Sequence, residues 1–303
     1  MTEVYEKLRP LLFSIAYRML GSASEAEDVV QEAFLRFHRA TEEGEKIESP
    51  KAFLTTVTTR LSIDQLRSAR VQRETYTGTW LPEPLLTAEA PDDTAQHAET
   101  ADSLSMAFLV LLESLTPVER AVFLLREVFD YPYSEIAEVI GKSEDNTRQL
   151  AVRARRHVDE RKPRFEADRK RRDELASSFL AAIEDGDTED LMHLLAEDVV
   201  LYGDGGGKAP AIARPLHGRE RVAKALATWA KLGDQMGVVI RPAEVNGAPG
   251  AIARDAAGRI LSVLSIHIAD GVVQSVRSVV NPDKLAHLGP VADAYELLRG
   301  RAR

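Results

Sequence analysis

Two short helical patterns meet at a glycine-containing turn, Gly141-Lys142-Ser143. Residues 134–140 have the length of a short helix, and Gly141 supplies a backbone conformation that other residues adopt only at a cost. Ser143 suits the N-cap of a second helix, because its hydroxyl can accept a hydrogen bond from a free backbone N–H. Spacings of four, three and four then predict the buried line of that helix, which is Thr147, Ala151, Ala154 and Val158. Two helices around a tight turn predict a helix-turn-helix.

The outward side of the second helix is rich in basic and amide side chains: Asn146, Arg148, Gln149, Arg153, Arg155 and Arg156. Such side chains can form paired hydrogen bonds with base edges, and basic groups further along can neutralise phosphates. Residues 148–172 carry a net charge of +7, whereas residues 1–147 carry −12 and residues 173–303 carry −4. A basic block in an acidic chain favours a DNA-contacting surface. The alternative is a solvated helix of an ordinary bundle, followed by a linker.

Residues 1–75 show helical patterns throughout. Ser24 and Glu27 predict a capping box, followed by a buried stripe of Ala26, Val30, Ala33 and Phe37. A later helix is predicted to begin at Ser49-Pro50, with serine as N-cap and proline at the first helical position. Its apolar line is Phe53, Val57 and Leu61. On or near its other side lie Arg60, Asp64, Arg67 and Arg70.

The middle of the chain contains two predicted linkers. Residues 76–100 include three prolines and many polar residues, which interrupt the helical pattern. Residues 101–163 are helical again, with Thr116 as an N-cap before Pro117. Residues 164–172 form a basic linker.

Residues 173–303 predict an α+β domain. Two helical patterns lead into a strand at 199–202, a further helix follows near 218–231, and three strand-like runs close the chain at 237–245, 258–269 and 271–280. Asp270-Gly271 is a strong hairpin signal. Pairing across that turn is expected to place four polar residues on one face of the sheet, where they could line a pocket: Ser265, His267, Gln274 and Ser278.

Composition excludes several classes of site. The chain of 303 residues contains no cysteine, so it has neither disulfides nor thiolate metal sites, and this suits a reducing cytosol. Asp204 stands alone, and His217 and His267 lack metal-ligand spacing, so no metal or cofactor is predicted. The first residues lack the pattern of a signal peptide, and no apolar run approaches the roughly 20 residues of a membrane helix. We expect a cytoplasmic protein without a membrane partner.

Several stretches together resemble known proteins. Residues 24–37 (SEAEDVVQEAFLRF), 52–70 and 115–156 resemble regions 2 and 4 of bacterial extracytoplasmic-function sigma factors. Residues 74–85, 202–211 and 281–285 (NPDKL) are similar to the SigJ-type subgroup, which carries a fused SnoaL-like domain. The resemblance implies a multidomain fold. Its parts are a region 2 helical bundle at 1–75, a region 4 helix-turn-helix at 101–163, and a cone-shaped α+β domain at 173–303.

The resemblance also implies two partners, the RNA polymerase core enzyme and promoter DNA. The residues expected at the polymerase contact are Glu27, Asp28, Val30, Gln31, Glu32 and Leu35. Helical spacing places Asp28, Gln31, Glu32 and Leu35 in one exposed strip. Without the resemblance, this strip is typical of a merely solvated face.

Promoter contacts are expected from two helices. For the −10 element they are Arg60, Asp64, Arg67 and Arg70, with Arg60 standing where many relatives carry asparagine. Whether Arg60 meets a base or a phosphate stays open. For the −35 element they are Ser143, Asn146, Thr147, Arg148, Gln149, Arg153, Arg155 and Arg156.

The glycine-rich run 201–210 (LYGDGGGKAP) does not match a phosphate-binding loop of the Walker type, because Ala209-Pro210 follows Lys208. We expect it to contact the sigma regions or polymerase, since glycines let backbone groups approach another surface closely. The expected regulatory residues are Asp204, Gly205, Gly206, Gly207, Lys208, Asn281, Asp283 and Lys284.

The leading hypothesis is a non-enzymatic sigma factor whose C-terminal domain modulates its activity. The alternative is a one-component DNA-binding regulator or enzyme with a SnoaL-like domain that binds a small ligand or performs catalysis.

Overall fold

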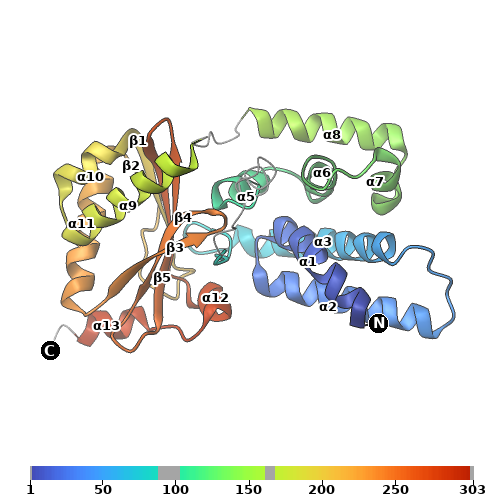
Figure 1. Ribbon diagram of the computed structural model, residues 1–303, viewed down its shortest axis with the longest axis horizontal. Helices are drawn as coiled ribbons and strands as arrows, with labels where there is room; N and C mark the ends of the chain where they lie inside the picture. The colour runs from blue at the N-terminus through green and yellow to red at the C-terminus, as the bar shows by residue number, and fades with distance from the viewer. Residues whose placement is uncertain (1, 88–102, 161–167, 301–303) are drawn as a thin grey trace. The chain divides into compact units, whose positions relative to one another are not determined.

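The structure is a computed structural model that describes residues 2–87, 103–160 and 168–300, and the chain divides into two compact units (Figure 1). The first unit comprises Met1–Thr75 and Leu109–Lys162, and the second comprises Tyr76–Phe108 and Pro163–Arg303. Residues 76–87, predicted as part of a linker, therefore belong to the second unit. The basic linker predicted at 164–172 falls partly outside the described residues, and the described part enters a helix at Arg169.

The first unit is all-helical. Its elements are α1 (Thr2–Leu20), α2 (Ala23–Glu42), α3 (Pro50–Glu74), α6 (Pro117–Phe123), the π-helix η1 (Leu124–Val128), α7 (Tyr133–Ile140) and α8 (Glu144–Asp159). The division between the units falls inside α5 (Met106–Leu112). The two predicted all-α domains are confirmed.

Helices α1, α2 and α3 pack against one another as a bundle. The predicted buried stripe of α2 is confirmed, with Ala26, Val30 and Ala33 wholly buried. The predicted N-cap was wrong: Ser22, not Ser24, accepts a hydrogen bond from the backbone N–H of Glu25 at 3.1 Å. Gly21, with a φ of 69°, follows the last residue of α1, so α2 begins almost at once.

Helix α3 begins as predicted, with Ser49 Oγ accepting from the backbone N–H of Ala52 at 3.2 Å and Pro50 as its first residue. Its fully buried side, however, is more polar than expected. The residues without exposed surface are Leu54, Thr55, Thr58, Thr59 and Ser62, whereas Phe53, Val57 and Leu61 are only half-buried.

The helix-turn-helix is confirmed. Thr116 and Glu119 form a capping box at the start of α6. Gly141 ends α7 in the left-handed conformation with a φ of 65°, and Ser143 Oγ accepts from the backbone N–H of Asn146 at 3.3 Å to begin α8. The predicted inward residues of α8, Thr147, Ala151, Ala154 and Val158, are all buried.

The second unit is α+β. Its helices are α9 (Arg169–Asp185), α10 (Thr188–Leu194), α11 (Arg219–Gln235), α12 (Pro282–Leu285), the 3-10 helix η2 (Ala286–Leu288) and α13 (Ala294–Gly300). Its strands are β1 (Leu195–Asp204), β2 (Leu216–His217), β3 (Val239–Val245), β4 (Ala248–Arg254), β5 (Ile260–Ala269) and β6 (Val272–Val279).

Within the described residues the sheet has six strands in the order β2-β1-β6-β5-β4-β3. The strands β3 to β6 form an antiparallel meander, and β1 joins β6 in parallel. Strand β4 was not predicted, because its sequence APGAIAR contains Pro249 and Gly250, which signal a turn. Gly250 allows a close approach of β5, since a Cβ there would lie 2.2 Å from Leu264 O.

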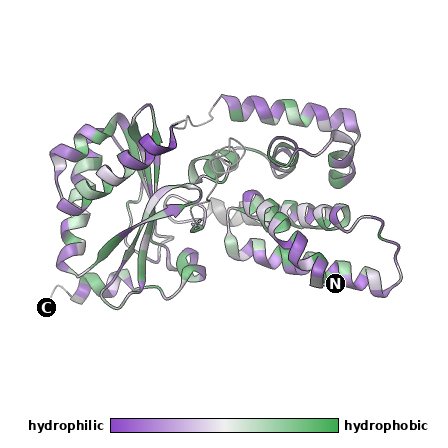
Figure 2. Ribbon diagram, viewed as in Figure 1, coloured by the Kyte–Doolittle hydropathy of each residue, from purple (hydrophilic) through white to green (hydrophobic). Residues whose placement is uncertain are grey.

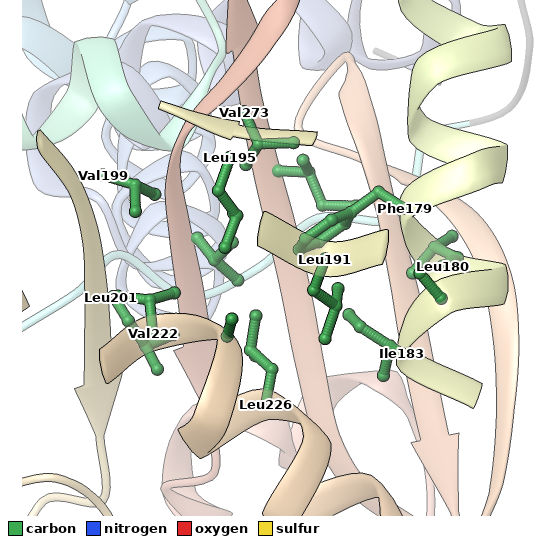
Figure 3. Close-up of a cluster of buried hydrophobic side chains, with 14 of the residues drawn as sticks. Phe179, Leu180, Ile183, Leu191, Leu195, Val199, Leu201, Val222, Leu226 and Val273 are labelled. Atoms are coloured by element: carbon green, nitrogen blue, oxygen red, sulfur yellow. The ribbon is translucent and has the colours of Figure 1, made fainter. Parts of the chain in front are cut away.

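Helices α9, α10 and α11 lie against one face of the sheet (Figure 1). Apolar side chains from these helices and from β1 and β6 form a core that includes Phe179, Leu191, Leu226 and Val273 (Figure 3). In Figure 2 the helices of this unit alternate between hydrophilic and hydrophobic residues, and the strands include long hydrophobic stretches.

Polar residues of the β5–β6 hairpin are divided between two faces of the sheet. Asp270 and Gly271 form the predicted turn, both with positive φ. Ser265 pairs with Arg277 and Leu264 pairs with Ser278, so Ser278 shares a face with Leu264 and not with Ser265. The expected single polar face was therefore wrong. The pairing register of β5 with β6 also shifts between His267 and Ile268, which marks a β-bulge.

Candidate functional site

The surface of α2 carries the acidic strip predicted from the sequence. Asp28 and Gln31 are exposed, and Leu35 is exposed over 49% of its surface. Glu32 forms an ion pair with Arg36 at 2.7 Å, and Glu27 pairs with Arg9 of α1 at 2.5 Å. An exposed leucine among carboxylates offers both apolar and charged contacts to a partner.

Val30 differs from the other residues expected at this contact. Its side chain has no exposed surface, because it belongs to the buried stripe of α2. Val30 therefore supports the strip from inside the bundle and does not lie on its surface.

Arg60 of α3 is bound to the end of another helix. Its Nε donates to Val139 O at 2.8 Å, and its Nη2 donates to Glu138 O at 2.9 Å. These carbonyls belong to the last turn of α7, where backbone acceptors lack helical partners and the helix dipole favours a positive charge. The guanidinium thus joins α3 to the first helix of the helix-turn-helix.

The other residues expected at a −10 contact lie further along α3. Asp64 and Arg67 are exposed and form an ion pair at 3.1 Å. The side chain of Arg70 lies outside the described residues.

The outer face of α8 presents Asn146, Arg148, Gln149, Arg153, Arg155 and Arg156, all of which are exposed. Thr147 does not share that face. It is wholly buried and its hydroxyl donates to Ser143 O at 2.9 Å, which excludes it as a base contact in this conformation. Ser143 is exposed but already serves as the N-cap.

Three arginines of α8 are paired with carboxylates. Arg148 pairs with Glu144 and lies 4.7 Å from the centre of the Tyr133 ring. Arg156 pairs with Glu160 at 3.1 Å.

Arg155 pairs with Glu127 of η1 at 2.5 Å, and the hydrogen bond that its guanidinium donates to the Glu127 carboxylate raises the pKa of Arg155. The arginines of all three pairs are exposed, and ion pairs of exposed groups are weak.

Gln149 and Arg153 differ from these arginines. Neither side chain has a hydrogen-bond or ion-pair partner among residues 2–87, 103–160 and 168–300. Gln149 is on the first turns of α8 and Arg153 one turn further, so both are free to meet a ligand without breaking an existing contact.

The glycine-rich run and the NPDKL motif meet residues 76–81 inside the second unit. Asp204, at the end of β1, has no exposed surface. Its carboxylate accepts from the Tyr76 hydroxyl at 2.5 Å, from the backbone N–H of Leu81 at 2.8 Å, and from Lys284 Nζ at 2.7 Å.

Lys284 completes this cluster from α12. Its ammonium also donates to Leu81 O and lies 4.4 Å from the centre of the Trp80 ring. A buried charge pair needs such additional hydrogen bonds to offset the loss of water. Burial raises the pKa of Tyr76, and the hydrogen bond to Asp204 raises it further, so the phenol remains the donor.

Gly206 is required by this packing. Its φ is 58°, and a Cβ there would lie 2.2 Å from Asn281 Nδ2 and 3.0 Å from the Tyr76 hydroxyl. Asn281 in turn donates to the Tyr76 hydroxyl at 2.9 Å. The glycines thus allow the backbone of the run to approach another segment closely, and that segment is residues 76–81 of the same unit.

The residues that were expected to make regulatory contacts therefore do not form an open docking surface. Asp204, Asn281 and Lys284 are buried, and exposed Lys208 pairs with exposed Asp283. Sequence reasoning missed Tyr76, Trp80 and Leu81 as their partners, although these residues lie in the motif at 74–85 that carried the resemblance.

Neither a metal centre nor a membrane span is found in the part of the chain that the structure describes. No group of three or more histidine, aspartate or glutamate side chains could hold a metal there. No helix among the described residues has the length and apolar character needed to cross a membrane.

An all-helical unit with a basic helix-turn-helix, together with an acidic strip on α2, is the combination expected of a DNA-binding protein with a protein partner. Comparison with protein families identifies two of its parts. Residues 4–71 match Sigma-70 region 2, and residues 105–158 match Sigma-70, region 4.

Whole-chain relatives extend this similarity to the second unit. The chain is 37% identical to the ECF RNA polymerase sigma factor SigJ of Mycobacterium tuberculosis, covering 99% of this chain and 97% of the relative. It is 31% identical to a probable ECF RNA polymerase sigma factor, SigI, of the same species, covering 91% and 92%.

The crystal structure of Mycobacterium tuberculosis SigJ superimposes with a TM-score of 0.74 at 36% identity, covering 94% of this chain and 98% of that one. The chain therefore belongs to the extracytoplasmic-function RNA polymerase sigma factors.

Proposed function

We propose that α2 binds the polymerase core, that α3 and α8 contact the −10 and −35 promoter elements, and that the second unit regulates these activities. The observation that carries the proposal is the combination of the exposed strip Asp28, Gln31 and Leu35 with the basic outer face of α8. A regulator that acts without polymerase has no need of such a strip. The one-component regulator is therefore not favoured. We propose no reaction for the chain. We also propose that it acts in the cytoplasm, where transcription takes place.

The first unit, as described, is a closed form. Tyr131 OH and Thr55 Oγ1 are hydrogen-bonded at 3.1 Å, and Arg120 Nη1 donates to Met19 O at 2.6 Å. With the contacts of Arg60 to α7, these bonds tie the region 2 helices to the region 4 helices. Arg60 is consequently occupied by protein acceptors and not by DNA.

Promoter binding requires this closed form to open. Elements centred near −10 and −35 lie roughly 25 base pairs apart, or about 85 Å at 3.4 Å per base pair. Helices α3 and α7 pack directly on each other. Two helices in direct contact do not span that separation, so the α3–α7 contact must break when both elements are bound.

The second unit binds the described part of the segment that connects the two sigma regions. Residues 76–81 are fixed by Asp204 and Lys284, and Leu85 N–H donates to Asn246 Oδ1 at 2.9 Å. A segment that is bound at these residues cannot extend there. Its retention on the second unit thereby limits the separation of α3 and α6, and its release permits the open form.

The core contact is tested by charge reversal on α2. Asp28→Arg is expected to weaken binding to core polymerase by about 2 kcal/mol, roughly thirtyfold in Kd, because it sets like charge against a basic partner surface. Glu45→Arg is the matched control, since Glu45 is exposed in the loop after α2 and outside the strip. Affinity is measured by titration with labelled core enzyme.

Circular dichroism establishes that both variants are folded. A folded Asp28→Arg protein that binds core as tightly as Glu45→Arg would contradict the assignment of the strip. Run-off transcription with the same proteins then shows whether weaker core binding lowers promoter-dependent initiation.

A further inference from the structure

A cavity of about 490 Å³ lies in the second unit between the sheet and its helices. Its walls come from α9 through Leu180 and Ile183, from α11 through Leu226 and Trp229, and from α13 through Leu297. Native interiors contain few voids larger than one water molecule. A cavity of this size is instead in the range of small-molecule binding sites.

The lining is mainly aliphatic, which makes ordered water a poor occupant, since a buried water requires several polar partners. An apolar molecule would instead gain contacts with the walls. The cavity therefore suits an occupant with a largely apolar body.

Two serines add a specific polar feature. Ser262 of β5 and Ser278 of β6 line the cavity, and each is only 8% exposed. Neither hydroxyl has a hydrogen-bond partner among residues 2–87, 103–160 and 168–300. They lie on adjacent strands and on the same face, because Ser278 pairs with Leu264, two residues after Ser262. Buried hydroxyls are normally hydrogen-bonded, so this pair is suited to hold an oxygen of a ligand.

Charge restricts the ligand further. None of the described residues that line the cavity is lysine, arginine or histidine, and the charged ones are Glu184 and Asp234. Both carboxylates are exposed. A ligand carboxylate or phosphate would lose its water without gaining a counter-ion, and would meet two like charges. A neutral ligand meets neither penalty.

We propose that this cavity binds a neutral, largely apolar molecule that carries one hydrogen-bonding oxygen, with that oxygen held by Ser262 and Ser278. The inference rests on the cavity alone and does not require the proposed roles in transcription. It assigns a ligand class to the second unit. Binding of such a ligand in the cavity can then alter the stability of the unit.

The test uses the full-length protein and two probes of equal chain length, decanol and decanoate, at a pH at which the acid is ionised. Binding is measured by calorimetry and by the rise in thermal unfolding temperature that a ligand of the native state produces. We expect decanol to bind saturably at one site and decanoate to bind about tenfold more weakly or not at all. Failure of decanol to bind, or equal affinity for both probes, would overturn the proposal.

Variants locate the site. The double change Ser262→Ala and Ser278→Ala is expected to weaken decanol binding about tenfold while narrowing its advantage over decanoate. Ala230→Phe places a ring into the cavity and should abolish binding. Thr228→Phe is its matched control, because Thr228 is exposed on the same helix and does not line the cavity.

Unchanged decanol binding in both the serine variant and Ala230→Phe would place the alcohol elsewhere and contradict the proposal. If Ala230→Phe is unfolded by circular dichroism, the serine variant decides, since it removes two hydroxyls without adding volume.

Discussion

Asp204 and Lys284 show how a residue can be singled out by sequence and yet be assigned the wrong environment. Both belong to motifs that carried the family resemblance, and both were expected at a docking surface because the motifs lie at strand ends, where loops project from a sheet. In the structure Asp204 has no exposed surface and Lys284 is 8% exposed. Burial depends on Tyr76 and Leu81, which lie more than a hundred residues away in sequence. A pattern read along the chain does not reveal such a partner.

The buried pair leads to a prediction about stability. Lys284→Ala leaves the carboxylate of Asp204 buried without its cation, and should lower the free energy of unfolding by about 3–5 kcal/mol. Lys208→Ala is the matched control, because Lys208 pairs with Asp283 on the surface, with 58% and 61% of these side chains exposed. Loss of that exposed pair should cost less than about 1 kcal/mol.

Urea unfolding followed by circular dichroism measures both effects. Adding Asp204→Asn to Lys284→Ala should recover part of the loss, because the uncompensated charge is then removed. Equal losses for Lys284→Ala and Lys208→Ala would show that burial of the pair has no energetic consequence.

The outer residues of α8 divide by position. Arg148 and Gln149 lie near the start of the helix, where recognition helices usually meet base edges, whereas Arg156 lies near its end. Arg148→Ala should cost about 1–3 kcal/mol at a matched promoter and relax the preference at one −35 position. Arg156→Ala should weaken all promoters alike and reduce the salt dependence of binding.

Both variants are compared in holoenzyme on a set of promoters with single −35 substitutions, at several salt concentrations. If the two changes alter base preference in the same way, this division of roles is incorrect. Arg148 must also leave Glu144 to reach DNA, so Glu144→Gln is expected to strengthen promoter binding modestly.

At the scale of elements, local signals determined how well the sequence predicted each one. The helix-turn-helix was predicted because its caps and glycine turn are encoded within a few residues, at Thr116, Gly141 and Ser143. Strand β4 was missed because Pro249 and Gly250 mimic a turn, although pairing on both sides makes the segment a strand. On α3, Thr55 and Thr58 are buried by tertiary packing, which hydrophobic periodicity does not detect.

The contact between α3 and α7 gives the prediction at this scale. Arg60→Ala removes two hydrogen bonds to the last carbonyls of α7 and should shift the closed form toward the open one by about 1 kcal/mol, roughly fivefold. Arg67→Ala is the control, because Arg67 pairs with Asp64 on the same helix.

The chain has no cysteine, so Ala52→Cys and Lys142→Cys provide two unique and exposed labelling positions for energy transfer. Free Arg60→Ala protein should show lower transfer than the parent, whereas Arg67→Ala should not. Equal transfer in all three proteins would mean that Arg60 does not hold the closed form.

At the scale of the whole molecule, each compact unit combines two segments that are not consecutive in the chain. The first unit is made from Met1–Thr75 and Leu109–Lys162, and the residues between them fold with the C-terminal part. Sequence reasoning treated 76–100 as a linker, because prolines and polar residues interrupt the helical pattern there. Its described residues 76–87 instead contribute Leu81, 1% exposed, to the second unit.

Truncation tests this interleaving. In residues 1–162, Trp80 is the only tryptophan, since the chain has two and the other is Trp229. Full-length Trp229→Phe therefore reports the same side chain in the intact protein, where Lys284 lies 4.4 Å from the Trp80 ring. Emission of Trp80 should move to longer wavelength in the 1–162 chain, because its partners at 204 and 284 are absent and water replaces them.

A chain ending at Val280, with Trp229→Phe, isolates the NPDKL motif from the rest of the unit. It retains Asp204 but loses Asn281 and Lys284, so Asp204 is left without its cation and the 76–81 segment should again be released. Both truncated chains should consequently differ from full length in run-off transcription with core polymerase. Unshifted emission in 1–162 would show that the C-terminal part does not bury the segment, and the proposed restraint on the separation of α3 and α6 would then have no anchor.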